Sequence, residues 1–226
     1  MKVLGIDTAS NIASVAVVQG QHVLAEQRSD TSGHRADLLV LVDAVCTAAG
    51  VTARDLDGIA IGAGPGSFTG LRIGMATAKG IAFAAVRPLW AVSSLAALAL
   101  PDLVADPSAI VVGVLDARRG EVYAGAYAIG SSGPALVGEE RVLPPGELAA
   151  FAPAGARFVG DAAGAYPELA QLPGTWGQTP SGSAVAIIAQ GGARVDALVS
   201  GAPTYIRPSE AEVKYPNGVP GALRKR

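Results

Sequence analysis

The stretch from Ile59 to Val86, IAIGAGPGSFTGLRIGMATAKGIAFAAV, constrains the fold more than any other part of the chain. It opens with a short apolar run, 59–61, between two glycines, which is the pattern of a buried strand. Three glycines and a proline follow within 62–66, and such a turn needs backbone conformations that most side chains disfavour. Ser67 stands where a helix N-cap is expected, and no proline interrupts 68–86. The stretch therefore predicts a strand, a tight glycine loop and a long helix.

Small residues recur every four positions along this helix. They are Gly70, Gly74, Ala78 and Ala82, and this spacing places them in one stripe on a helical surface. A glycine inside a helix costs roughly 1 kcal/mol relative to alanine, whereas small side chains let a second backbone come close. The stripe predicts close packing, either within the chain, on its own sheet or a neighbouring helix, or against a partner chain.

Composition excludes several classes of protein. Half of the 226 residues are hydrophobic and 16% are charged, so the chain is too apolar to be disordered. No apolar run reaches the roughly 18 residues of a membrane span without a charge or a turn. The single cysteine, Cys46, excludes a disulfide within the chain, and the net charge of −2 gives no overall attraction to nucleic acid.

The first residues, MKVLGIDTAS, pass directly into a strand pattern without a signal peptide. Together with the missing membrane span, this start predicts a cytoplasmic protein.

The first half begins with strands expected at 2–6, 12–18 and 22–28, joined by short turns into an antiparallel meander. A helix is expected over 34–49, ending at Gly50. The remaining elements of this half are strands at 57–61 and 89–92 and a helix at 93–100.

The helix at 34–49 is apolar on almost all sides. Its apolar positions include Leu38, Leu41 and Val45, and it carries few charges. One sheet can cover only one face of a helix, so the other faces need a different cover. The pattern is a second indication of a partner chain or of a tightly packed helix pair.

A proline-bracketed linker is expected near 101–108. It divides the chain into a subdomain of residues 1–104 and a smaller one of residues 105–226. In the second half, strands are expected at 110–115, 121–129, 135–142 and 157–159, and helices at 145–151, 183–191 and 193–200. Each half begins with a strand, an Asp-bearing turn and a second strand, which indicates a duplicated α/β architecture.

The glycine loop matches none of the common phosphate-binding motifs. It lacks the Gly-Lys-Ser/Thr of a P-loop, and Ser67 stands where the third glycine of GxGxxG belongs. The start of a helix can still hold an anion. Ser67 is therefore a candidate anion contact, and a simple strand-to-helix turn is the alternative.

Other polar residues carry weaker signals of chemistry. Asp7 and Thr8, after the first strand, can meet a magnesium–phosphate group or form an Asx-turn. Arg118 and Arg119 can bind a phosphate or a partner's carboxylates, or can be solvated at a hairpin tip. No GxSxG elbow accompanies the two histidines of the chain, which argues against a serine hydrolase. No second histidine follows His34 at a metal-binding spacing.

Three segments are similar to one known family. GIDTAS at 5–10, GAGPGSFTGLRIG at 62–74 and DARRGEVYAGAY at 116–127 resemble the TsaB family, within the sugar kinase, heat-shock chaperone and actin superfamily. The similarity continues more weakly through 160–164 and 205–207. This resemblance implies an α/β fold of two ribonuclease-H-like subdomains, with mixed sheets flanked by helices.

The resemblance also implies a role in bacterial tRNA modification. With the paralogue TsaD and the ATPase TsaE, the family is required to place a threonylcarbamoyl group on the adenosine beside the anticodon of tRNAs that read codons beginning with A. TsaD carries the chemistry on a metal held by an HxxxH motif, which here reads HRADL from His34 to Leu38. The resemblance thus implies that the chain is a non-catalytic subunit without a cofactor of its own. ATP and a metal ion are expected on its partner subunits, and its contact with tRNA is expected to be indirect.

The family's first two helices bind TsaD, or a second copy when TsaD is absent. In this sequence they are 34–49 and 67–86. The interface residues that the resemblance implies are His34, Leu38, Leu41, Val45, Gly70, Gly74, Ala78 and Ala82. The superfamily's nucleotide-binding motifs are degraded in this sequence, and Asp7-Thr8 is the part of them that still matches.

An enzyme that acts alone is the alternative. A superfamily phosphotransferase would use Asp7 near magnesium, and a peptidase would use Ser67. The lack of a triad, of a metal-binding histidine pair and of a P-loop argues against both.

Overall fold

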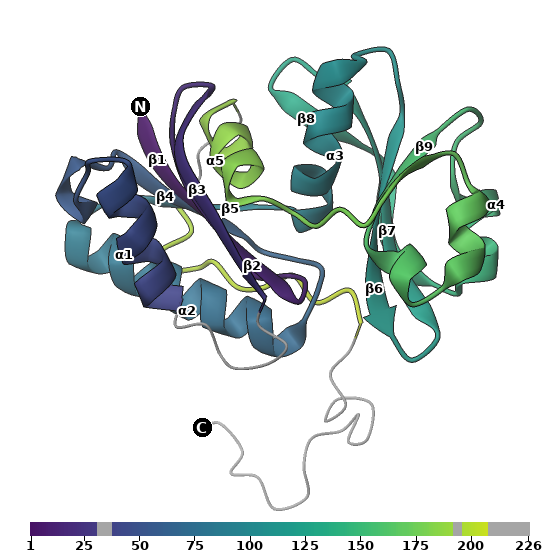
Figure 1. Cartoon of the computed structure of the whole chain (residues 1–226), viewed down its shortest axis with the longest axis horizontal. Helices are drawn as coiled ribbons and strands as arrows, with labels where there is room; N and C mark the ends of the chain where they lie inside the picture. The colour runs from purple at the N-terminus through teal and green to yellow at the C-terminus, as the bar shows by residue number, and fades with distance from the viewer. Residues whose placement is uncertain (31–37, 192–195, 208–226) are drawn as a thin grey trace, which may run out of the picture.

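The structure is a computed structural model, and it describes residues 1–30, 38–191 and 196–207. The chain forms two lobes, each built on a five-stranded mixed sheet with helices against it (Figure 1). The strand orders are β3-β2-β1-β4-β5 in the first sheet and β10-β9-β6-β7-β8 in the second. The predicted α/β class, with two mixed sheets flanked by helices, is confirmed.

The first sheet consists of β1 (Lys2–Asp7), β2 (Ile12–Gln19), β3 (His22–Asp30), β4 (Gly58–Gly62) and β5 (Leu89–Val92). The first three strands form the predicted antiparallel meander, because two short turns join them. β4 lies parallel to β1, and β5 lies parallel to β4. Parallel neighbours need crossover connections, and α1 (Leu38–Ala48) and α2 (Phe68–Ala85) lie in these connections.

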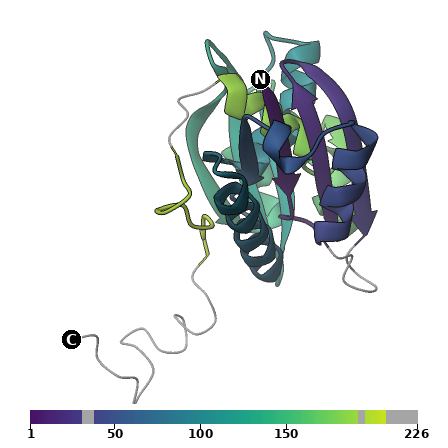
Figure 2. The same ribbon diagram turned by 90° about the vertical axis from the view of Figure 1, so that its left-hand side faces the viewer.

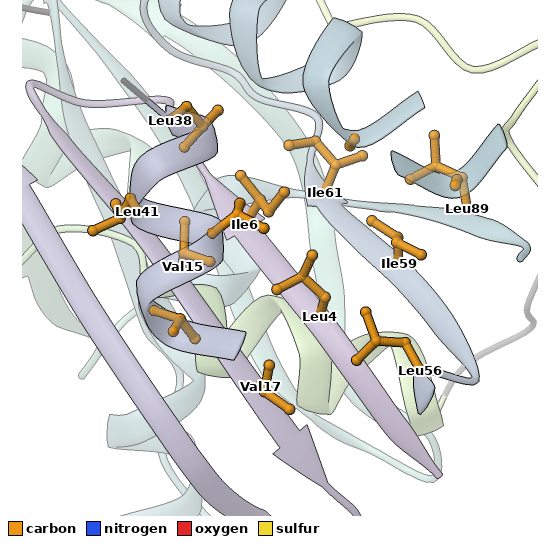
Figure 3. Packing of buried hydrophobic residues seen from close by; sticks show 14 of the residues in the cluster. Leu4, Ile6, Val15, Val17, Leu38, Leu41, Leu56, Ile59, Ile61 and Leu89 are labelled. Carbon is orange, nitrogen blue, oxygen red and sulfur yellow. The ribbon is translucent and has the colours of Figure 1, made fainter. Parts of the chain in front are cut away.

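Both crossover helices cover the same face of the first sheet (Figure 1), and they lie next to each other when the molecule is turned (Figure 2). The core between them and the sheet is apolar, and Leu38 and Leu41 of α1 belong to the same buried cluster as Ile6 and Val15 of the sheet (Figure 3). The opposite face of the sheet is covered by α5 (Gly182–Gly191). At Gly5 the two elements are so close that a Cβ would lie 2.0 Å from the carbonyl oxygen of Gly182.

The second sheet consists of β6 (Val111–Arg118), β7 (Glu121–Gly130), β8 (Gly133–Leu143), β9 (Arg157–Gly160) and β10 (Gly174–Trp176). Its first three strands form an antiparallel meander, and β9 and β10 extend the sheet in parallel. This is the topology of the first sheet, so the predicted duplication is confirmed. The helices that pack against this second sheet are α3 (Ser94–Ala105) and the short α4 (Leu148–Phe151), and short 3-10 turns lie between the described elements.

The division into subdomains near residue 104 stays a prediction. The two sheets separate near that point, but α5 returns from the second half of the chain to the first sheet.

The predicted linker at 101–108 is wrong in its first part, because α3 continues to Ala105 with Pro101 inside it. A proline inside a helix costs about 3 kcal/mol. The helix, however, buries Leu100 and Leu103, and each buried leucine contributes about 1.5–3 kcal/mol. Burial of this apolar face outweighs the missing hydrogen bond.

The helix predicted at 193–200 is wrong over its described part, 196–200, which is not helical. There the backbone bonds to the edge of the first sheet instead. The N–H of Ala197 donates to the carbonyl of Leu89 at 2.6 Å, and the N–H of Leu89 donates to the carboxylate of Asp196 at 3.1 Å. We call residues 196–207 the C-terminal segment.

Candidate functional site

The glycine loop between β4 and α2 is fixed against the β1–β2 turn. The N–H of Ser67 donates to the carbonyl of Ala9 at 2.7 Å. A Cβ on Gly66 would lie 2.3 Å from the same oxygen, so this position requires glycine. Ser67 caps α2, because its hydroxyl accepts the N–H of Gly70 at 3.3 Å. The predicted strand, loop and capped helix are confirmed.

The small-residue stripe of α2 faces the chain's own sheet. A Cβ on Gly70 would lie 2.2 Å from the carbonyl oxygen of Thr8, and one on Gly74 would lie 2.2 Å from the Thr8 hydroxyl. Ala78 and Ala82 are completely buried in the core. Close packing within the chain accounts for the stripe, and the contact with a partner expected at these positions stays a prediction.

The expected contacts on α1 are also directed inward. Leu38, Leu41 and Val45 are buried against the sheet, because they lie on the one face of this apolar helix that the sheet covers. Their contact with a partner stays a prediction. His34 lies outside the described residues.

The same two helices leave a different set of apolar side chains in solvent. Leu39 and Val40 on α1 are 57% and 64% exposed. Ile73 and Phe83 on α2 are 42% and 76% exposed. We call the surface of these four residues the two-helix face. Exposed apolar residues on neighbouring helices are a feature of protein–protein interfaces.

A second candidate site is a cavity of about 1070 Å³ between the lobes. The β1–β2 turn, the start of α2, the β6–β7 hairpin and the C-terminal segment form its walls. Among the described residues, its charged lining consists of Arg72, Asp116, Arg118, Arg119, Asp161 and Arg207.

Asp7 and Thr8 do not line this cavity. The Asp7 carboxylate is completely buried, and it accepts hydrogen bonds from the Ser94 hydroxyl at 2.7 Å and from the N–H of Ala9 at 2.8 Å. Burial raises the pKa of Asp7 to about 6, although the bonds from Ser94 and Ala9 oppose this rise. The Thr8 hydroxyl donates to the carbonyl of Gly70 at 2.8 Å. These internal bonds join β1 to α2 and α3, and the cofactor contact expected at Asp7 and Thr8 stays a prediction.

The predicted anion contacts Ser67, Arg118 and Arg119 do line one cavity. Both arginines have positive φ, 61° and 59°, at the tip of the β6–β7 hairpin. This left-handed conformation costs about 1–2 kcal/mol for a residue with a Cβ. Arg118 reaches across the cavity, where its Nη2 donates to the Asn11 side chain at 3.1 Å, and its Nη1 pairs with Asp116 at 3.0 Å.

The Asp161 side chain holds the β6–β7 hairpin through a hydrogen bond to its backbone. Its carboxylate accepts the N–H of Asp116 at 3.0 Å. Burial raises the pKa of Asp161, and the nearby Asp116 carboxylate adds to this rise.

The C-terminal segment closes one side of the cavity and connects the lobes, as the yellow-green trace in Figure 1 shows. The N–H of Thr204 donates to the carbonyl of Ala63 in the first lobe at 2.7 Å. Arg207 donates to the carbonyl of Ala117 in the second lobe at 2.7 Å and pairs with Glu121. Sequence reasoning missed Arg72 and Arg207 as cavity residues, because only the fold brings them beside the hairpin.

None of the helices that the structure describes is long and apolar enough to cross a membrane. Within the described ranges, no three histidine, cysteine or acidic side chains gather as metal ligands.

Two such sheets with helices against them and a cavity between them define the actin and sugar-kinase class of ATPase fold. The activator of the 2-hydroxyisocaproyl-CoA dehydratase from Clostridium difficile has this fold at a TM-score of 0.51 and 9% identity, over 84% of this chain and 94% of its own. At this identity the likeness concerns the fold alone.

A family model described as TsaD, tRNA N6-adenosine threonylcarbamoyltransferase, matches residues 24–199. The chain belongs to this family, and the resemblance to its TsaB members is confirmed. YeaZ from Pseudomonas aeruginosa is 31% identical with a TM-score of 0.77, over 90% of this chain and 99% of its own. An uncharacterized protein of Mycobacterium tuberculosis strain H37Rv is 38% identical over 65% of this chain and 70% of its own.

The tRNA threonylcarbamoyladenosine biosynthesis protein TsaB of Escherichia coli K12 is 37% identical over 56% of this chain and 55% of its own. The match thus spans about half the length of this curated relative.

Proposed function

We propose that this chain is a subunit required for forming threonylcarbamoyladenosine in tRNA. It serves as a non-catalytic partner of TsaD, together with TsaE. The name carried by the curated relatives supports the pathway. The exposed apolar residues on α1 and α2 support the mode of action, because one chain alone leaves these side chains in solvent.

The two-helix face is the surface that binds TsaD, and it binds a second copy of the chain when TsaD is absent. The apolar centre of an interface excludes water, and a few large side chains there carry most of the binding free energy. Phe83 and Ile73 are suited to this role because both are large apolar side chains that are exposed in the free chain. The proposal keeps the two predicted helices, α1 and α2, but changes the residues on them that contact the partner. The outward-facing residues take the place of the buried ones.

Threonylcarbamoyl transfer then belongs to the partner, along with its metal ion and ATP. The chain holds TsaD in an active arrangement and meets the tRNA indirectly.

The two enzyme alternatives find less support. The Ser67 hydroxyl caps α2, and Asp7 is enclosed by its own hydrogen bonds. Within the described residues, the Ser67 hydroxyl bonds to the backbone of α2 and the Asp7 carboxylate to Ser94, and neither bonds to a histidine.

Affinity for purified TsaD tests the proposal. We expect Ile73→Asp and Phe83→Asp each to weaken binding at least about 30-fold, as for residues that contribute about 2 kcal/mol or more. Val104→Asp is the matched control, because Val104 is an equally exposed apolar residue of α3 and lies outside the two-helix face.

Isothermal titration calorimetry measures the affinity, and circular dichroism verifies that each variant is folded. Wild-type affinity in both two-helix variants, with folding intact, would contradict the proposal.

A further inference from the structure

Arg72 is held in one position where the two-helix face meets the cavity. Its guanidinium carbon lies 3.9 Å from the centroid of the Phe68 ring. Its Nε donates to the hydroxyl of Tyr205 at 3.0 Å, and the two aromatic rings lie 5.1 Å apart. Stacking on an aromatic ring and a hydrogen bond at Nε fix the plane of a guanidinium before it binds anything. Arg72 is therefore a preorganised cation on an exposed surface.

Arg72 differs from most arginines that the structure describes, because it has no carboxylate partner among the described residues. Ion pairs are formed by Arg28, Arg118, Arg141, Arg157 and Arg207. In the described part of the chain, the two terminal nitrogens of Arg72 donate to no acceptor. An arginine whose Nε is occupied keeps the four N–H donors of its two terminal nitrogens for a ligand.

Apolar and aromatic side chains surround Arg72 where it borders the two-helix face. Ile73 is the next residue along α2 and belongs to the two-helix face, and Phe68 and Tyr205 are each about 40% exposed. A partner that covers Ile73 also reduces the water around Arg72. A guanidinium that loses water needs an anion in exchange, because a buried unpaired charge is costly.

We propose that Arg72 binds a carboxylate of the protein that docks on the two-helix face. The proposal rests on the proposed function and adds the chemistry of its partner, which presents an aspartate or glutamate beside apolar side chains. A planar carboxylate can accept two parallel hydrogen bonds, one from each terminal nitrogen of the guanidinium. The apolar residues supply affinity, whereas this single pair selects the partner and fixes its register, because a partner without the carboxylate leaves the cation desolvated and unpaired.

Three variants separate recognition from a merely structural role. Arg72→Glu reverses the charge, Arg72→Lys keeps the charge but loses the planar fork, and Tyr205→Phe removes only the anchoring hydroxyl. We expect affinity for TsaD to fall about 100-fold for Arg72→Glu, about 10-fold for Arg72→Lys, and less than about 3-fold for Tyr205→Phe. We also expect raised salt to weaken the wild-type complex more than that of Arg72→Gln.

A charge-reversal rescue identifies the partner group. Exposed acidic residues of TsaD are changed one at a time to arginine, and one such change is expected to restore binding of Arg72→Glu.

The outcomes distinguish this proposal from the proposed function. If Arg72→Glu binds TsaD like the wild type while Ile73→Asp does not, Arg72 has no recognition role and the interface stands. If Tyr205→Phe weakens binding as much as Arg72→Glu, Arg72 acts by holding the C-terminal segment, and the proposal is overturned. If Arg72→Glu keeps TsaD binding but loses affinity for a tRNA anticodon stem-loop, the ligand is a phosphate and the proposal also fails.

Discussion

At Gly74 the missing side chain is what lets α2 lie against β1. The space a Cβ would need is filled by the Thr8 hydroxyl, 2.2 Å away, and by Ile61, whose terminal carbon lies 3.2 Å away. Thr8 is fixed in turn by its bond to Gly70. Glycine thus stands in the helix for packing, despite its low helix propensity.

Gly74→Ala is expected to lower the free energy of unfolding by about 1–3 kcal/mol, the usual range for overpacking. Gly80→Ala is the matched control, because a Cβ at Gly80 meets open space. It is expected to raise the free energy of unfolding by up to about 1 kcal/mol through better helix propensity. Urea denaturation measures both, and a Gly74→Ala variant as stable as Gly80→Ala would contradict this account of the stripe.

The buried carboxyl of Asp7 is expected to make stability depend on pH. Its pKa is about 6 in the folded chain, above the ordinary value of 3.8 for an aspartate, so the folded state holds this proton more tightly than the unfolded state. The contribution is fully present below about pH 4 and is lost as pH rises through 6, a change of about 3 kcal/mol.

Asp7→Asn removes this titration. We therefore expect the stability difference between variant and wild type to shift in favour of the variant by about 3 kcal/mol from pH 4 to pH 7. Chemical denaturation at several pH values measures it, and a difference independent of pH would contradict the assignment.

At the scale of elements, α2 ends at a residue whose backbone conformation is unfavourable for its side chain. Val86 closes the helix in the left-handed region with φ 54°, and the N–H of Arg87 donates back to the carbonyl of Ala82 at 2.9 Å. Glycine is the usual residue at such an end, since a side chain with a Cβ costs about 1–2 kcal/mol there. Val86 is 86% exposed, so packing within the chain does not offset this cost.

Val86→Gly is expected to raise the thermal midpoint, by relieving about 1 kcal/mol of backbone strain. Val86→Ala keeps a Cβ at this position and is expected to gain much less. Differential scanning calorimetry compares the two, and equal midpoints would mean that the helix end is not strained.

Most elements could be predicted because their signals are local. The strand, loop and cap around Ser67 follow from glycine, proline and apolar runs. The extension of α3 past Pro101 could not be predicted, because it depends on Leu103 being buried by another lobe. The turn at 196–200 depends on the open edge of β5, which no local pattern reveals.

For the candidate site, the sequence indicates two apolar helices but not which of their residues lie in solvent. The spacing of Gly74 and Ala78 reveals a close contact, and it does not say which neighbour makes that contact. The structure assigns these residues to the sheet and leaves Ile73 and Phe83 outside. Arg72 needed the fold, since its partner Tyr205 is 133 positions away in the sequence.

At the scale of the whole molecule, the C-terminal segment joins the two lobes across the cavity. Arg207 contributes most to this connection, because it bonds to the carbonyl of Ala117 and pairs with Glu121 in a half-buried environment. The two lobes are therefore expected to unfold together.

Arg207→Ala is expected to lower the free energy of unfolding by about 1–3 kcal/mol, since it leaves buried acceptors without a donor. Arg141→Ala is the control, because the Arg141–Glu139 pair is exposed on both sides and such pairs contribute less than about 1 kcal/mol. Guanidinium denaturation compares them, and equal effects would show that Arg207 does not connect the lobes.

Formation of threonylcarbamoyladenosine on tRNA, in a reaction reconstituted with TsaD and TsaE, tests the role of this chain most directly. We expect product only when the chain is present. Val104→Asp and Asp7→Asn are expected to support the reaction like the wild type, and Ile73→Asp is expected to abolish it. Undiminished product with Ile73→Asp, or product lost with a folded Asp7→Asn, would contradict a non-catalytic subunit that acts through its two-helix face.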